Sequence, residues 1–174
     1  MNYFEFYELP LRFELDTAAL QQRFYANSKK YHPDFYTLTD AAKQAEILEL
    51  STLNNEAYQT LRDPDRRMAY LLRLQGALGD EGQNKIPQDF LMEVMDLNET
   101  LMELEFDYDA AAYERVRGEV AALEEALWRA IAPRVVAYRG EAGQAVDLEA
   151  IKNYYLKKRY LLRIRENLNK FAAR

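Results

Sequence analysis

The stretch Tyr31-His32-Pro33-Asp34 divides the first part of the chain into two helical segments. Proline disfavours α-helical geometry in the preceding residue and donates no backbone hydrogen bond, so the helix that Asp16 can cap must stop at Pro33. Asp40 can cap a second long helix, which ends at Asp63-Pro64. The pattern therefore predicts two helices joined by a tight, exposed turn.

The rest of the chain also repeats with helical period, and no strand-like alternation persists. Residues 76–86 hold three of the six glycines, lack that period and precede Pro87, which suits the first turn of a helix. We expect an all-α fold with a first domain over 1–75, a linker over 76–86 and a three-helix bundle over 87–174. The apolar stripes that predict the bundle are Phe90, Val94, Leu97, Leu101 and Leu104; Tyr113, Val116, Val120, Leu123 and Leu127; and Tyr154, Leu161, Ile164, Leu168 and Phe171.

Composition excludes several kinds of function. The 174 residues include no cysteine and one histidine, so thiolate metal sites, cysteine nucleophiles and multi-histidine metal sites are impossible. The net charge of −6 disfavours nucleic acid as a partner. Apolar runs are too short to cross a membrane, and the amino terminus carries no export signal, so we expect a cytoplasmic location.

The order of motifs over about the first 70 residues resembles that of a J-domain, the module that stimulates ATP hydrolysis by DnaK-type chaperones. The His-Pro-Asp tripeptide lies in that order among the following residues: Tyr3-Phe4, Leu9-Pro10, Leu20, Phe24, Asn55-Glu56-Ala57-Tyr58, Leu61, Asp63-Pro64, Arg66-Arg67 and Tyr70. The resemblance implies a J-domain helical hairpin whose chaperone-binding residues are His32, Pro33, Asp34, Arg23, Lys29 and Lys30. It also implies that hydrolysis takes place in the partner, so we predict no catalytic residue, cofactor or metal in this chain.

The physical chemistry of the tripeptide agrees with this interpretation. Pro33 keeps His32 out of a helix, and the Asp34 carboxylate can accept charge-assisted hydrogen bonds from an arginine of a partner. Tyr25, Ala26 and Phe35 stand where J-domains often carry basic residues. These departures weaken electrostatic steering toward an acidic chaperone surface.

A second apolar stripe accompanies the core stripe between Phe90 and Phe106. Glu99 and Glu103 lie along its outer margin, and its members are Leu91, Met92, Met95, Met102 and Phe106. A bundle helix normally needs one apolar stripe, and flexible methionine side chains suit a surface that receives a protein partner. The alternative is that both stripes are buried between the other helices.

The two halves together resemble the HscB family of J-type co-chaperones of iron–sulfur cluster biogenesis. The resemblance rests on the tripeptide, on Phe90-Leu91-Met92-Glu93 with Asn98-Glu99 and Glu103, and on Arg159-Tyr160-Leu161. It implies that the bundle binds the cluster scaffold protein IscU through Leu91, Met92, Met95, Asp96, Glu99, Glu103 and Tyr160. Tyr160 replaces a phenylalanine of familiar members, and Asp96 replaces a glutamate. The absence of an amino-terminal cysteine-based zinc site suggests a bacterial-type member.

We therefore predict a co-chaperone that is not itself an enzyme. It would bind IscU and stimulate a DnaK/HscA-type chaperone, promoting iron–sulfur cluster assembly or transfer. Three alternatives stay open: a J-domain adaptor whose bundle serves another client or self-associates, a small hydrolase that uses His32 as a base, and a helical DNA-binding module.

Overall fold

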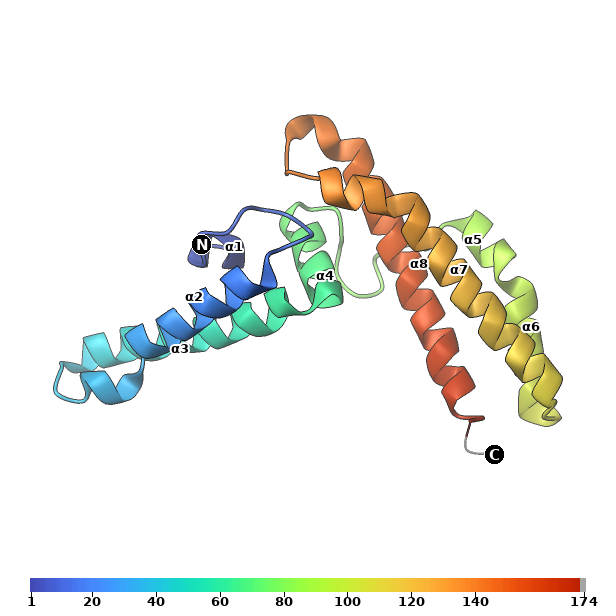
Figure 1. The fold of residues 1–174 in the computed structure, drawn as a ribbon, viewed down its shortest axis with the longest axis horizontal. Coiled ribbons are helices and arrows are strands. Elements are labelled where there is room, and N and C mark those ends of the chain that lie inside the picture. The colour runs from blue at the N-terminus through green and yellow to red at the C-terminus, as the bar shows by residue number, and fades with distance from the viewer. Residues whose placement is uncertain (173–174) are drawn as a thin grey trace. The chain divides into compact units, whose positions relative to one another are not determined.

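The computed structural model describes residues 1–172, which contain helices and no strand (Figure 1). The chain forms two compact units. The first contains Met1–Gln75 and Tyr138–Glu141, and the second contains Gly76–Ala137 and the chain from Ala142 onward. Residues 76–86, the predicted linker, thus cluster with the second unit, while Tyr138–Glu141 cluster with the first.

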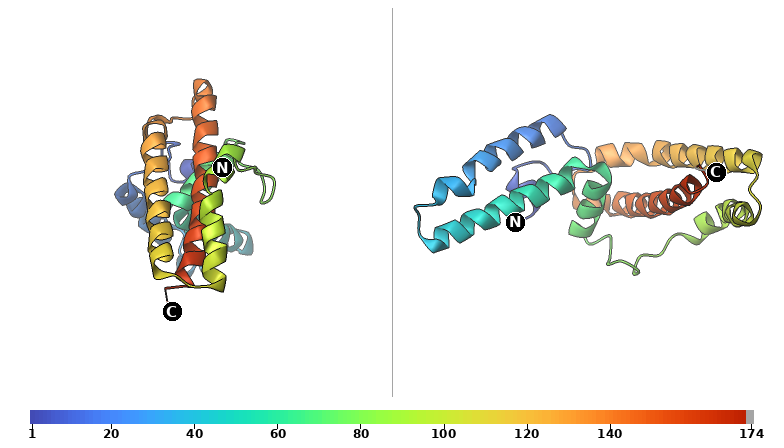
Figure 2. Two further views of the ribbon diagram at one scale, coloured as in Figure 1. Left: turned by 90° about the vertical axis from the view of Figure 1, so that its right-hand side faces the viewer. Right: turned by 90° about the horizontal axis from the view of Figure 1, so that it is seen from below.

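The first unit is built on a hairpin of two long helices that lie side by side, α2 and α3 (Figures 1 and 2). Its elements are α1 (Tyr3–Phe6), α2 (Thr17–Lys30), the short 3-10 helix η1 (Pro33–Tyr36), α3 (Ala41–Arg62) and α4 (Pro64–Leu74).

The predicted caps of these helices are confirmed. The Asp16 carboxylate accepts from the backbone N–H groups of Ala18 and Ala19, and Asp40 accepts from the Lys43 N–H. Asp63 caps α4, whose first residue is Pro64. The short α1, which the sequence analysis did not predict, begins at a capping box between Asn2 and Glu5.

A buried asparagine joins three segments of the first unit. The Asn54 amide nitrogen donates to the Phe24 carbonyl over 3.2 Å and to the Ser28 hydroxyl over 3.1 Å. The Tyr7 hydroxyl donates to the backbone carbonyl of Asn54 over 2.7 Å and lies 2.8 Å from its side-chain oxygen. Because every polar atom of this side chain has a partner, burial of the amide fixes how α2 and α3 pack.

The second unit is the predicted bundle. Its elements are α5 (Gln88–Glu93), α6 (Met95–Phe106), α7 (Ala110–Ala137), the 3-10 helix η2 (Ala142–Gln144) and α8 (Ala145–Asn169). The long helices α7 and α8 pack against each other, and α6 packs on both (Figure 2, left). The predicted core stripes supply the core, with Tyr113, Leu123 and Leu127 only partly buried.

The first predicted bundle helix is interrupted at Val94, where φ is −94° and ψ is 5°. Hydrogen bonding nevertheless continues across the interruption, since the Val94 N–H donates to the Phe90 carbonyl and the Asn98 N–H donates to the Val94 carbonyl, each over 3.1 Å. Helical spacing therefore relates residues of α5 to residues of α6.

Candidate functional site

The His-Pro-Asp loop follows α2 directly and is held by local hydrogen bonds. His32 has an extended backbone, as a residue before proline should, and Pro33 begins η1. The Asp34 N–H donates to the His32 Nδ1 atom over 3.3 Å, so His32 caps η1 with its own side chain. The Tyr36 hydroxyl donates to the Lys30 carbonyl over 2.7 Å, which ties η1 to the end of α2.

All three residues of the tripeptide are exposed. The outward turn predicted from the sequence is therefore confirmed. Since Nδ1 accepts a hydrogen bond, the neutral imidazole carries its hydrogen on Nε2, where it can donate to a partner. The Asp34 carboxylate is the most exposed of the motif's polar groups and lies 3.7 Å from His32 Nδ1. The loop thus presents a donor and an anionic acceptor on a fixed backbone.

The basic residues assigned to the same surface differ in their surroundings. Lys29 and Lys30 are exposed next to the loop, and Lys30 Nζ lies 5.1 Å from the centre of the Tyr31 ring. The Arg23 guanidinium instead donates to the Tyr7 carbonyl and lies 3.8 Å from the Glu8 carboxylate. Arg23 therefore contributes to the packing of the first unit, while Lys29 and Lys30 are exposed cations close in sequence to the tripeptide.

In the bundle, the second apolar stripe of α5 and α6 lies on the surface. Met92 and Met102 are 66% and 62% exposed, and Met95 and Phe106 are exposed as well. Leu91 is partly buried. Of the two alternatives, a surface stripe is therefore correct and a doubly buried helix is wrong. An exposed apolar row of this size is unusual for a bundle helix, and it makes this face a candidate for contact with a protein partner.

An acidic row runs beside the apolar one. Met92, Asp96, Glu99 and Glu103 follow one another at steps of four, three and four, and all four are exposed. Leu91, Met95, Met102 and Phe106 form the neighbouring row at the same kind of spacing. Six of the seven predicted scaffold-binding residues thus lie on these two adjacent rows.

The seventh, Tyr160, comes from α8 and contacts the same helices. Its ring packs edge-on against Phe90 with 5.8 Å between ring centres. Its hydroxyl accepts a hydrogen bond from the Asn98 amide over 2.7 Å. Asn98 lies at helical spacing between Met95 and Met102, so Tyr160 adjoins the apolar row. The contact between Asn98 and Tyr160 could not be predicted from the sequence, because pairing across helices leaves no periodic signal.

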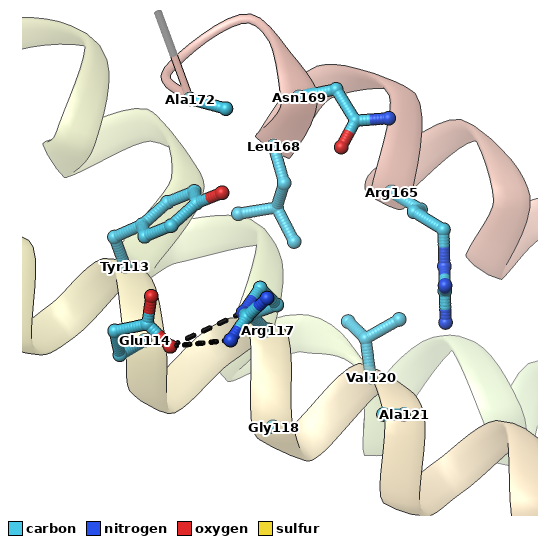
Figure 3. Close-up of a pocket in the computed structure, with 10 residues that line it drawn as sticks. All are labelled: Tyr113, Glu114, Arg117, Gly118, Val120, Ala121, Arg165, Leu168, Asn169 and Ala172. Atoms are coloured by element: carbon cyan, nitrogen blue, oxygen red, sulfur yellow. Dashed lines mark hydrogen bonds and ion pairs between the residues drawn. The ribbon is translucent and has the colours of Figure 1, made fainter. Parts of the chain in front are cut away.

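A separate hollow of about 530 Å³ lies between α7 and α8 (Figure 3). Arg117 and Glu114 form an ion pair of 2.9 Å on one wall, and Val120, Leu168 and Ala172 supply apolar surface. None of the described residues that line it is a serine, threonine, cysteine or histidine. Over residues 1–172 no group of three or more His, Asp or Glu side chains is placed to hold a metal ion, and no helix there is long and apolar enough to span a bilayer.

An outward His-Pro-Asp loop on a helical hairpin, together with a three-helix bundle, defines a J-type co-chaperone. The profile described as HSCB C-terminal oligomerisation domain matches residues 86–169. A co-chaperone protein HscB homologue of Chromobacterium violaceum is 37% identical over 133 residues, which are 75% of this chain and 76% of the relative. One from Vibrio cholerae is 43% identical over 102 residues, covering 58% of this chain and 60% of the relative, less than two thirds of its length.

Two solved structures resemble the whole chain. Chaperone HscB from Vibrio cholerae has a TM-score of 0.67 at 29% identity, with 99% of this chain and 98% of the other covered. The human co-chaperone protein HscB has a TM-score of 0.71 at 28% identity, with 99% and 82% covered. The chain belongs to the HscB family, and this confirms the resemblance seen in the sequence: it is a J-type co-chaperone of iron–sulfur cluster biogenesis.

Proposed function

We propose that this chain binds an IscU-type scaffold protein and stimulates ATP hydrolysis by a DnaK/HscA-type chaperone. Residues 1–75 would bind the chaperone, 87–174 would bind the scaffold, and 76–86 would connect the two. The observation that carries the proposal is that each unit exposes one surface suited to a protein partner, the tripeptide loop in the first and the apolar and acidic rows in the second.

The chaperone-binding surface would consist of His32, Pro33 and Asp34 with Lys29, Lys30 and Arg23. The Arg23 guanidinium is partly exposed and also donates to the Tyr7 carbonyl. An exposed carboxylate on a fixed backbone can form a bidentate, charge-assisted contact with an arginine of the ATPase. A contact of this kind changes the rate of hydrolysis when it is stronger in the hydrolysis-competent state of the ATPase than in its resting state. The reaction itself then belongs to the chaperone.

The scaffold-binding surface would use both rows of α5 and α6. Burying Leu91, Met92 and Met95 against a partner removes apolar area from water, at about 1.5–3 kcal/mol for each fully covered side chain. Asp96, Glu99 and Glu103 favour a partner with a basic surface and increase the rate of encounter. Tyr160 adds an aromatic contact with a polar tip.

Placing both surfaces on one chain has a thermodynamic reason. A scaffold held by the second unit is presented to the chaperone at the effective concentration set by the link between the units. Two modest affinities then combine into one stable ternary complex. The gain in effective concentration explains why one chain would carry both binding surfaces.

The test is chaperone ATPase turnover measured with this protein, with an IscU-type scaffold, and with both. We expect stimulation by this protein alone and a larger stimulation when both are present. An assay with no chaperone serves as the control and tests the alternative of a hydrolase using His32. Turnover that is unchanged by this protein, with or without scaffold, would contradict the proposal.

Self-association of the bundle is the second candidate function. The matching profile is described as an oligomerisation domain, and the hollow between α7 and α8 offers a surface outside the two rows. Sedimentation velocity over a range of protein concentrations tests it. A sedimentation coefficient that rises with concentration supports self-association, and a constant monomer value excludes it.

A further inference from the structure

The loop that carries the tripeptide also exposes large apolar side chains. Phe35, Leu38 and Leu48 are 73%, 100% and 60% exposed. They lie on η1, on its connection to α3 and on α3 itself, all at one end of the hairpin. We call these three residues the apolar tip.

The apolar tip is continuous with the tripeptide. The Phe35 ring lies 5.5 Å from the His32 imidazole, measured between ring centres. Leu48 and buried Ile47 line a hollow of about 270 Å³ whose other walls include Pro33 and Asp34. A molecule that binds the Asp34 carboxylate therefore also meets apolar surface.

Charge at this end of the hairpin is balanced, because Lys29, Lys30 and Lys43 are offset by Asp34, Asp40 and Glu46, so it steers little toward an acidic surface. Residues 32–42 contain two aspartates and no lysine or arginine. The next cation, Lys43, is held 2.8 Å from Glu46. Only Lys29 and Lys30 remain to attract an acidic partner, and exposed charges of that kind are screened by salt.

We propose that the apolar tip is a docking surface for the chaperone, and that it receives one or more apolar side chains adjacent to the arginine that pairs with Asp34. This inference rests on the proposed function and deepens it by naming the chemistry of the partner surface. Burial of apolar side chains stabilises the complex without dependence on ionic strength, so it replaces steering by charge. Chaperone binding by this chain is consequently governed by contact area more than by long-range attraction.

The test compares the concentration of this protein that half-saturates stimulation of the chaperone ATPase, at about 50 mM and about 300 mM salt. For the natural chain we expect the two values to agree within about threefold. For the variant F35S/L38S/L48S we expect a value at least roughly tenfold higher at both salt concentrations, with the maximal stimulation retained. The control is Val146→Ser, which changes a 75% exposed apolar residue of α8 and should leave the value unchanged.

A second variant protects the test against loss of folding. The single substitution Phe35→Lys introduces a cation beside the tripeptide. We expect the concentration that half-saturates stimulation to become strongly salt-dependent in this variant. If the triple variant and the natural chain half-saturate stimulation at the same concentration, the inference is overturned while the proposed function stays intact. A natural chain that gives no stimulation at any concentration would overturn both the inference and the proposed function.

Discussion

The Asp34 N–H donates a hydrogen bond to His32 Nδ1 over 3.3 Å, so the histidine of the tripeptide caps the 3-10 helix that follows it. The two ring nitrogens of His32 therefore have different roles. Nδ1 holds the loop, and Nε2 is available to a partner. Because asparagine can cap through its side-chain oxygen but has no counterpart of Nε2, substitution can separate the two.

His32→Asn should therefore keep the fold of the loop and lose chaperone stimulation. We expect ATPase stimulation to fall at least about tenfold, with an unchanged melting temperature. The readouts are chaperone turnover and thermal unfolding followed by circular dichroism. Scaffold binding is the internal control, since the second unit is untouched. Full stimulation by His32→Asn would mean that the ring acts only as a cap.

The exposed methionines should carry scaffold binding. Met92→Ser with Met95→Ser removes two exposed side chains, so we expect the fold to persist and the dissociation constant for an IscU-type scaffold to rise at least roughly tenfold. Isothermal titration calorimetry measures the constant. Leu162→Ser is the control, because Leu162 is an exposed apolar residue of α8 in the same bundle, outside the two rows of α5 and α6. Equal losses of scaffold affinity in the two variants would refute a specific role for Met92 and Met95.

The acidic row should act on the rate of association. Asp96→Asn, Glu99→Gln and Glu103→Gln together should slow association with the scaffold several-fold at low salt and leave dissociation nearly unchanged. Stopped-flow mixing separates the two rates. The control variant carries Glu46→Gln, Glu49→Gln and Glu56→Gln on α3, which change the net charge equally in the other unit. An effect of the same size there would assign the slowing to net charge alone.

Much of this architecture can be predicted from the sequence because helical elements leave local signals. Proline and aspartate fix both ends of α2 and α3 and the start of α4. The helical period of the apolar residues fixes which side of each bundle helix is buried. The interruption at Val94 leaves no such signal, because Val94 itself belongs to the buried stripe. The sequence also does not predict that Tyr138–Glu141 belong to the first unit, since this depends on contacts between residues distant in sequence.

Of the exposed apolar surfaces, only the row on α5 and α6 could be predicted from the sequence, because only it follows the helical period. Two stripes on one helix indicate an exposed row, but Phe35, Leu38 and Leu48 share no period, and only the fold brings them to one end of the hairpin. The hydrogen bond from the Arg23 guanidinium to the Tyr7 carbonyl is likewise set by the fold, and a role of Arg23 in chaperone binding stays a prediction.

Removing the buried amide at Asn54 should destabilise the first unit. Asn54→Ala leaves the Phe24 carbonyl and the Ser28 hydroxyl without this donor, while Tyr7 keeps the backbone carbonyl of residue 54. We expect a loss of about 2 kcal/mol in the free energy of unfolding, measured with urea. Asn55→Ala changes the exposed neighbour in the same helix and should cost under about 0.5 kcal/mol. Similar costs at the two positions would mean that the amide network contributes nothing.

The Tyr7 hydroxyl should make the first unit sensitive to alkaline pH. Burial raises the pKa of Tyr7 well above its ordinary value of 10.0, with a smaller contribution from Tyr58. In the unfolded chain the phenol ionises near that ordinary value, so above it the unfolded state binds fewer protons than the folded state. The contribution of Tyr7 to stability is therefore complete below about pH 10 and falls as the pH rises further.

Tyr7→Phe removes both the hydroxyl and its titration. At about pH 8 we expect the variant to be less stable than the natural chain by about 1 kcal/mol, because the hydrogen bond to Asn54 is lost. Between about pH 10 and about pH 11.5 the stability of the natural chain should fall more steeply, so the difference narrows. Urea unfolding at each pH measures the difference in free energy of unfolding between the two chains. Titration of the other tyrosines and of the lysines is common to both chains and cancels in this difference. A difference in stability that stays constant or widens over this range would show that Tyr7 ionises at least as readily in the folded unit as in the unfolded chain.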